Sequence, residues 1–381
     1  MNPDPHHTLQ NRSLSRMQLR GEPLRGTLQL RDGKTPVTIP WETTFPASLG
    51  YACIRCGHSC RNNDIMIFAL DNLADAPLQE EFPLLQLREN GACVLLQEPN
   101  TCTIHARKPA LCREYPCKAV FSEGRAFVDI TLSCTSLFAG HTGTFPTRMA
   151  EETIRSSWQR MKSFADEESI SRTIRAKAHE LGVLLETDPL SRLGIDIKET
   201  LGIVHKSYCI AVESGQAPFR YPVAADDQQP DTAHPQRRAS STRTSTASRP
   251  YRFSVLLPNQ DGVTILGIPG KHTLKALPLS AEAMQLLADY LAFFLNRATF
   301  LSDATLCLKA LATRVSLQDS LLIEETARRI AMTLIYLAHA SAAVDEDTSV
   351  SAQDISRAMF MADNTFMAPC TEIADALLRS R

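Results

Sequence analysis

Cysteine is the residue type in this chain whose spacing most clearly suggests chemistry. Of its eleven cysteines, Cys209, Cys307 and Cys370 are scattered, whereas eight fall within a stretch of the first half of the chain. The clustered residues are Cys53, Cys56, Cys60, Cys93, Cys102, Cys112, Cys117 and Cys134. Thiolate sulfur binds zinc and iron well, so the cluster predicts a metal site to which all eight are candidate ligands.

The spacing of the first group supports ligation. In Cys53-Ile-Arg-Cys56-Gly-His-Ser-Cys60, two intervening residues allow a tight turn to direct the sulfurs of Cys53 and Cys56 to one ion. Gly57 supplies backbone freedom directly after the second sulfur. Eight sulfurs exceed what one zinc ion needs. Either a subset binds one ion, or the set holds a polynuclear centre or more than one centre.

Basic residues accompany the sulfurs along the sequence. Four thiolates on a divalent ion leave a net charge of about −2, which favours nearby cations, and such cations lower thiol pKa values. Ordinary surface charge accounts equally well for any one of these residues. They are Arg55, Arg61, Arg107, Lys108, Arg113 and Lys118.

The motif C-x2-C-G-x-S-C-R, followed by C-x-L and C-x-I-H-x-R-K-P-x-x-C-R-x-Y-P-C, resembles the YkgJ-type cysteine-cluster family. The resemblance covers the stretch from Cys53 to Cys134 and implies zinc or iron chelation. It implies ligand roles for Cys53, Cys56, Cys60, Cys93, Cys102 and Cys112, and extends with less support to Cys117 and Cys134. Two residues depart from the family pattern. Ser59 replaces the first of two paired cysteines, and His105 replaces an aromatic residue.

Three further roles for the cysteines remain open besides metal ligation. They are a disulfide framework, a thiol-exchange centre at Cys56 or Cys60, and buried cysteines without a ligand. His58 and His105 fit outer-shell or surface positions better than ligand positions. The cofactor is either Zn²⁺ or an iron–sulfur cluster, and the number of sulfurs favours the cluster.

Two functions are consistent with the sequence. The first is a metal-binding protein with a structural or redox role, whose helical half binds an unidentified protein partner. The second is a lysine N-methylase, because the layout resembles flagellin lysine-N-methylases and the segment from Tyr290 to Arg297 is loosely similar to their aromatic helix. No P-loop, G-x-G-x-x-G or G-x-S-x-G motif supports a kinase, a classical methyltransferase or a hydrolase.

Composition limits the partners. The formal net charge of −2 argues against nucleic acid as a partner and against an anionic membrane surface. The most apolar stretch, 330–344, is too short to span a bilayer and indicates a buried helix. We therefore expect a soluble, cytoplasmic protein with no membrane contact.

The surrounding elements predict a mainly α fold with a small irregular α+β cysteine-cluster domain. We expect a polar flexible leader (1–35), the cysteine-cluster domain (36–140), a helical region (141–225), a disordered linker (226–250), and a C-terminal domain (251–381). The last begins with a β-hairpin near 251–269 around Asn259-Gln-Asp-Gly262 and continues as helices. Ser280 and Ser351 are expected to cap two of these helices, and a third is expected over 321–343.

Overall fold

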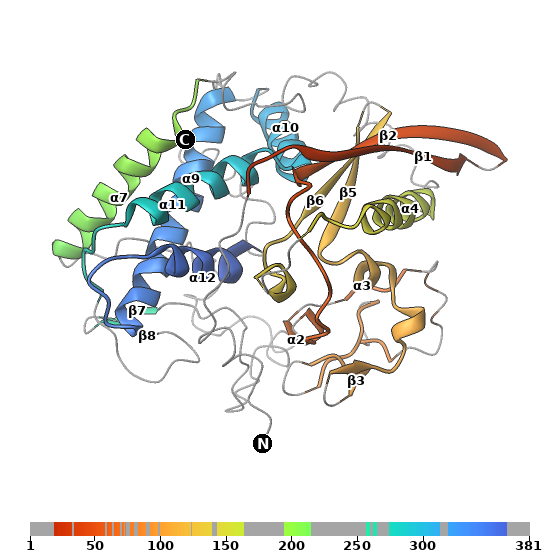
Figure 1. Cartoon of the computed structure of the whole chain (residues 1–381), viewed down its shortest axis with the longest axis horizontal. Helices are drawn as coiled ribbons and strands as arrows, with labels where there is room; N and C mark the ends of the chain where they lie inside the picture. The colour runs from red at the N-terminus through yellow and green to blue at the C-terminus, as the bar shows by residue number, and fades with distance from the viewer. Residues whose placement is uncertain are drawn as a thin grey trace, which may run out of the picture.

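The computed structural model describes residues 19–163 apart from short gaps, 194–214, 257–259, 262–264, 274–312 and 319–363. The gaps are residues 33, 58, 63–64, 69–70, 72, 74–76, 80–82, 89–91, 98–99, 123 and 139–142. The described chain has three parts (Figure 1). A sheet covered by one helix lies beside a helical half, and a small lobe that carries four of the eight clustered cysteines lies below the sheet.

The sheet combines two hairpins from different parts of the chain. Its strand order is β1-β2-β6-β5, formed by Pro23–Asp32, Thr35–Pro46, Arg125–Ile130 and Cys117–Ser122. The β1–β2 and β5–β6 pairs are antiparallel, and β2 and β6 are parallel where they join. Helix α4 (Thr147–Ser163) packs on this sheet against β5 and β6.

Strand β1 lies within the range expected to be a polar leader. Leu28 and Leu30 are buried and alternate with polar residues, as a strand with one covered face requires. Gly26 lies opposite Trp41 of β2, and a Cβ atom at Gly26 would lie 2.8 Å from the indole ring. Close packing of the two hairpin strands therefore depends on this glycine.

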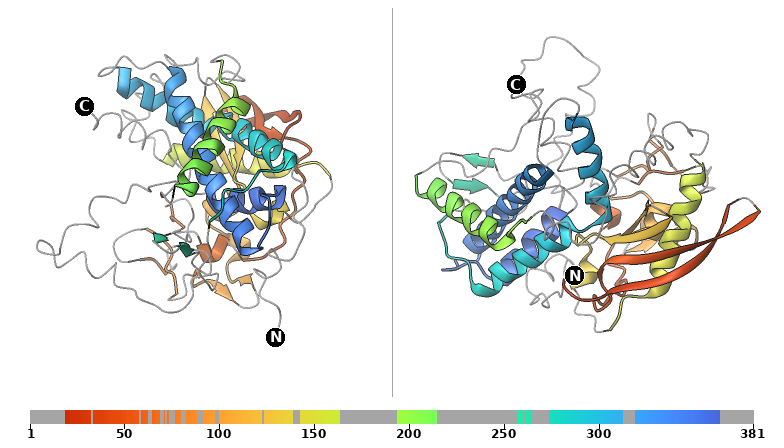
Figure 2. Two further views of the ribbon diagram at one scale, coloured as in Figure 1. Left: turned by 90° about the vertical axis from the view of Figure 1, so that its left-hand side faces the viewer. Right: turned by 90° about the horizontal axis from the view of Figure 1, so that it is seen from above.

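The helical half contains α7 (Ile197–Glu213), α9 (Ala281–Leu295), α10 (Ala298–Ala312), α11 (Asp319–Val344) and α12 (Ala352–Ala362). Helix α11 packs against α7, α9 and α12 (Figure 2). The predicted caps are confirmed. The Ser280 hydroxyl accepts from the Ala283 N–H, and Ser351 and Asp354 form a capping box.

Two buried carboxylates join the sheet to the helical half. Asp129 of β6 accepts the backbone N–H groups of Ala298 and Thr299 at the start of α10 (3.0 and 2.7 Å). Asp363, which follows α12, accepts the Leu132 N–H just after β6 at 2.7 Å and pairs with Arg297 at 2.9 Å. These contacts attach α10 and the end of α12 to the end of β6, and the sheet and the helical half share one core.

The fold class is α+β, because about half of the residues that the structure describes are helical and the sheet is mixed. The expected "mainly α" description holds only roughly, because β1 and β2 form a long hairpin that periodicity did not predict. The expected hairpin near 251–269 is present as β7 (Leu257–Asn259) and β8 (Gly262–Thr264). The expected linker, 226–250, lies outside the described residues. No described helix is long and apolar enough to cross a membrane.

Candidate metal centre

The clustered cysteines lie in two different hydrophobic cores. Cys60 and Cys93 belong to a small core inside the lower lobe, which also contains Leu85 and Leu96. Cys117 and Cys134 belong to the main core under the sheet. All ten described cysteines are free thiols, so the described residues contain no disulfide.

Four cysteines converge in the small lobe, and we call them the four-thiol set: Cys60, Cys93, Cys102 and Cys112. Cys60 lies in α2 (Ser59–Asn62) and Cys112 in α3 (Ala110–Glu114). Cys102 lies in β4 (Thr101–Cys102), which pairs with β3 (Leu96–Gln97).

Backbone hydrogen bonds hold these segments together. The N–H of Cys93 donates to the carbonyl oxygen of Cys60 at 2.7 Å, and the N–H of Thr103 donates to Leu95 at 3.0 Å. The bond from Cys93 joins α2 to the loop that leads into β3. The lobe is thus built from short segments that backbone hydrogen bonds join to one another.

Burial and the neighbouring thiols raise the pKa of three sulfurs in this set. Burial is the largest cause for Cys60, Cys93 and Cys112, and the pKa of Cys112 reaches about 12. Lys108 acts in the opposite direction on Cys60 and Cys112, and Arg88 does so on Cys93. Clustered thiols that repel as anions and lie beside cations are a donor set that suits a soft divalent ion or an iron–sulfur cluster.

Three cysteines lie together on the other side of Gly57, and we call them the surface set: Cys53, Cys56 and Cys134. The Cys56 sulfur lies 2.8 Å from the hydroxyl of Thr135. Burial, opposed in part by hydrogen bonds from Ser136, raises the pKa of Cys134 to about 11, and Cys56 and Cys53 add to the rise. The side chain of Tyr51 hydrogen-bonds Cys53, and burial is the main cause of its raised pKa.

Cys117 occupies a different environment from the other predicted ligands. It begins β5, pairs across the sheet with Ile130, and is buried in the main core. Burial raises its pKa, and a hydrogen bond with Thr153 of α4 opposes the rise. The structure thus places Cys117 between the sheet and α4. The neighbouring Cys134 thiol also contributes to its raised pKa.

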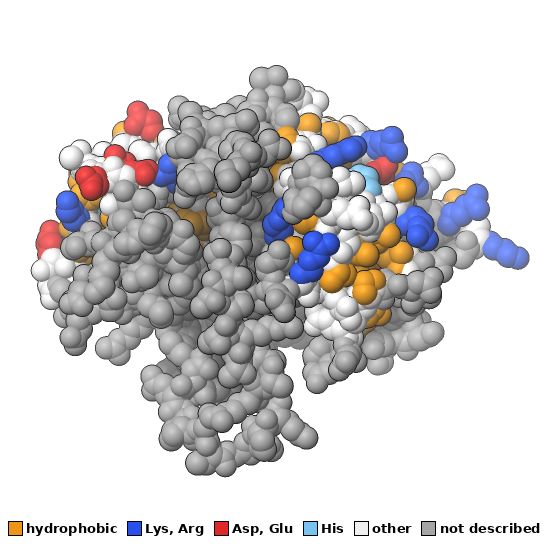
Figure 3. Space-filling view, turned by 90° about the horizontal axis from the view of Figure 1, so that it is seen from below, with side chains coloured by type: hydrophobic (Ala, Val, Ile, Leu, Met, Phe, Trp, Pro, Cys, Tyr) orange, Lys and Arg blue, Asp and Glu red, His pale blue; other side chains and the backbone are white. Residues whose placement is uncertain are grey.

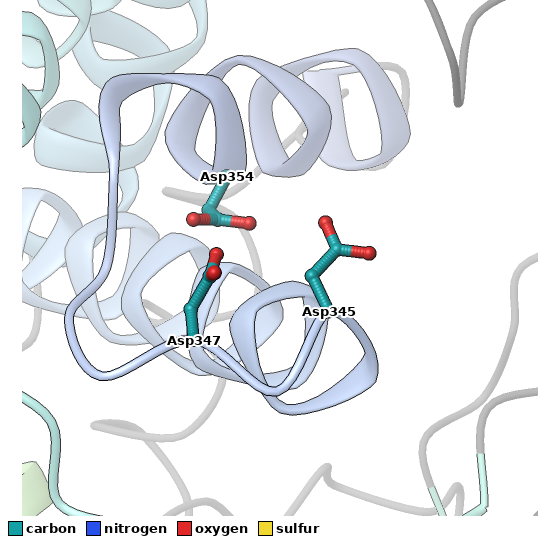
Figure 4. Close-up of side chains that lie close together, drawn as sticks. All are labelled: Asp345, Asp347 and Asp354. Carbon is teal, nitrogen blue, oxygen red and sulfur yellow. The ribbon is translucent and has the colours of Figure 1, made fainter.

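Only one trio of possible ligand residues in the described chain has its ligand atoms within 4.8 Å of one another, and it contains no sulfur. It consists of Asp345, Asp347 and Asp354 between α11 and α12 (Figure 4). Arg357 pairs with Asp345 and lies 3.8 Å from Asp354. The Asp354 carboxylate also accepts the backbone N–H of Ser351 in the capping box. Two of the three carboxylates thus already have partners in the fold. The sulfurs of either set must approach one another further to share an ion.

The side of the molecule with the small lobe carries Lys and Arg side chains beside hydrophobic ones (Figure 3). Arg55, Arg107 and Arg113 are exposed, as a surface role predicts. His105 is exposed as well, and Lys108 is the main cause of its lowered pKa. His58 lies outside the described residues.

Sequence reasoning overlooked the polar residues that hold the surface set. The Ile54 N–H donates to the hydroxyl of Ser136 at 3.2 Å, and Thr135 contacts Cys56. Tyr115 donates its hydroxyl to the carbonyl oxygen of Ser133 at 2.8 Å. The signal was the Ser-Cys-Thr-Ser run over 133–136, shortly after β6, in which hydroxyl residues flank one cysteine.

Comparison with known proteins gives one family. Residues 52–135 match the CxxCxxCC family, whose description reads "Putative zinc- or iron-chelating domain". Neither the curated proteins nor the solved structures contain a match to this chain. The matched range includes both cysteine sets and ends directly after Cys134.

Proposed function

Residues 52–135 belong to this cysteine-cluster family of zinc- or iron-chelating domains, and from that premise we propose that the chain binds a zinc ion or an iron–sulfur cluster through the four-thiol set. One observation carries the proposal. Four thiols from four separate segments meet in a lobe whose own core contains only four buried apolar residues among those described, namely Leu85, Ala92, Cys93 and Leu96.

So small a core supports the proposal energetically. Burying one large apolar side chain contributes about 1.5–3 kcal/mol, while ordering each backbone residue costs about 1–2 kcal/mol. Burial of the few apolar side chains in this core therefore falls well short of offsetting the entropy cost of ordering the lobe. A structural metal contributes folding free energy directly and so compensates for a small core.

Within such a centre the sulfurs, the nearby cations and the backbone have different roles. The four sulfurs lose their protons and bind the metal, which supplies the positive charge that makes this possible. Lys108 and Arg88 offset the negative charge that remains on the ligated thiolates. The Cys60–Cys93 backbone bond holds two ligand segments together before the metal arrives.

Metal content and an absorption spectrum test the proposal. We expect protein purified without oxygen to contain stoichiometric zinc without colour, or iron and sulfide with absorbance at about 400 nm. Cys112→Ser should lose the metal, whereas Cys307→Ser, which changes a buried cysteine of α10 outside the domain, should retain it. Wild-type protein without stoichiometric zinc or iron would contradict the proposal.

The lysine N-methylase function stays a second hypothesis. Its segment lies in α9 and the turn after it, where the Tyr290 hydroxyl and the Arg297 guanidinium both donate to Asp363. Both residues are buried, so these two side chains stabilise the fold. Incubation of the metal-loaded protein with S-adenosylmethionine and flagellin tests this hypothesis, because a methylase must increase the mass of lysine peptides.

A further inference from the structure

Two histidines meet at one backbone oxygen inside the helical half. His205 of α7 and His339 of α11 each place Nε2 3.1 Å from the carbonyl oxygen of Leu277, in the segment that leads into α9. The centroids of the two imidazole rings are 5.7 Å apart. His339 is fully buried, and His205 is partly buried. The Leu277 carbonyl therefore joins α7 to α11 through two ring nitrogens.

The surroundings of His339 make this arrangement sensitive to charge. Its Nδ1 lies 2.8 Å from the carbonyl oxygen of Ile335, while its Nε2 faces Leu277. A neutral imidazole has one N–H, so either tautomer directs a lone pair at one of the two oxygens. An imidazolium would donate to both oxygens, but its charge would sit on a side chain that is 0% exposed. Hydrogen bonding and burial therefore favour opposite charge states of this ring.

Burial has the larger effect on both rings. It lowers the pKa of His205 and of His339, and the carbonyl oxygens oppose the fall only in part. His205 lowers the pKa of His339 further, because two charged rings at this separation repel. Tyr208 of α7 places its ring centroid 4.2 Å from that of His339, and its buried hydroxyl has no hydrogen-bond partner in the part of the chain that the structure describes. Both histidines are therefore mainly neutral at pH 7 while α7 and α11 are packed.

Ionisable groups on the neighbouring helices offset a proton on His339 only in part. Asp354 at the start of α12 acts to raise the pKa of His339. Its carboxylate already belongs to the capping box of α12 and lies 3.8 Å from the Arg357 guanidinium. On α9, the hydroxyl of buried Tyr290 donates to Asp363 instead. The carboxylate that acts on His339 is therefore already shared.

We propose that His205 and His339 form an acid-sensitive latch. As neutral rings they hold the Leu277 carbonyl between α7 and α11, and their protonation in mildly acidic solution releases α7, so that the charged rings reach water. The folded state takes up these protons less readily than the unfolded state. The contribution of the latch to stability is thus present above the unfolded pKa of about 6.5 and is lost as pH falls below that value. This inference is independent of metal binding, because neither histidine lies in residues 52–135.

Hydrogen exchange of the full-length protein at pH 7.5 and pH 5.5 tests the latch. The protection factors of α7 peptides, corrected for the intrinsic exchange rate at each pH, should fall about 100-fold. A histidine that stays neutral in the packed state and titrates near 6.5 when released changes the opening equilibrium by about 10-fold at pH 5.5, and two histidines act together. Combining His205→Gln with His339→Gln leaves amides that can still donate to Leu277 but do not titrate, so most of the fall should disappear. His105→Gln, which changes an exposed histidine of the lobe, is the matched control and should keep the full fall.

A single variant keeps the test decisive if the double variant does not fold. His205→Gln changes a partly exposed position and should reduce the fall from about 100-fold to about 10-fold. Loss of metal from the lobe at pH 5.5 raises exchange in peptides of 59–114 equally in all variants, so it does not imitate this difference. Protection of α7 that stays constant or rises at pH 5.5 in the wild type would overturn the latch. So would a fall as large in the glutamine variants as in the wild type.

Discussion

The backbone N–H of Cys93 donates a 2.7 Å hydrogen bond to the carbonyl oxygen of Cys60, so two proposed ligands are joined through their main chains. The same bond connects α2 with the loop that leads to β3 and β4. Order in the small lobe and metal binding should therefore depend on each other.

Replacing one ligand should reveal this dependence. We expect Cys112→Ser to weaken metal binding more than about 100-fold, because changing even an outer partner of a ligand costs about 10–100-fold. Hydrogen exchange in peptides from 59–114 should rise, while peptides of β5 and β6 should change little. Cys307→Ser is the matched control, since it removes a buried sulfur far from the lobe in sequence. Unchanged exchange in the lobe would show that the ligand does not order it.

The metal-free protein should lose stability at alkaline pH. Burial raises the pKa of Cys60 and Cys93, and that of Cys112 to about 12, above the value of about 8.5 for an unfolded thiol. The folded state therefore holds these protons more tightly than the unfolded state. Their contribution is complete below the unfolded pKa and is lost as pH rises from about 9 towards 12.

Urea unfolding of the stripped protein at pH 8 and pH 10 measures this effect. The midpoint should fall between the two pH values, and Cys112→Ser should reduce that fall because serine does not ionise in this range. A midpoint that rises with pH would contradict the predicted sign.

The local features of the fold were predictable from the sequence, and the long-range ones were not. The caps at Ser280 and Ser351 involve residues three positions apart, so the sequence contains both partners. The pairing of β2 with β6 joins Trp41 to Ala126, and no local pattern indicates that contact. The β1 strand was missed because its polar residues outnumber the buried Leu28 and Leu30.

The candidate site shows the same limit. Motif spacing identified the cysteines, but spacing does not determine which core each sulfur enters. The division depends on the reversal at Gly57 and on contacts with Thr135 and Ser136. Those contacts exist only once the end of β6 has been positioned, and the pairing of Asp363 with Arg297 helps to position it.

A glycine pair tests the packing of the β1–β2 hairpin. Gly26→Ala should destabilise the protein by about 1–3 kcal/mol, because its Cβ would lie 2.8 Å from the Trp41 ring in a packed core. Gly202 lies in α7 with nothing within 4 Å of a Cβ, so Gly202→Ala should stabilise by about 0.5–1 kcal/mol. Urea unfolding measures both changes, and an equal effect of the two would refute the steric argument.

The buried pair of Arg297 and Asp363 in the helical half should be the most sensitive link to the sheet, because the Asp363 carboxylate also holds Leu132. Its side chains are 7% and 0% exposed, and Asp363 also accepts from Tyr290 and from the backbone of Leu132. Asp363→Asn keeps the shape but leaves Arg297 buried without its counter-charge, which should cost about 3–5 kcal/mol. Glu152→Gln makes the same chemical change at the exposed pair with Arg148 and should change the urea midpoint little. Since the cost arises from an uncompensated charge, Arg297→Met added to Asp363→Asn should restore part of the loss. A double variant that loses the sum of both single effects would show that the two residues act independently.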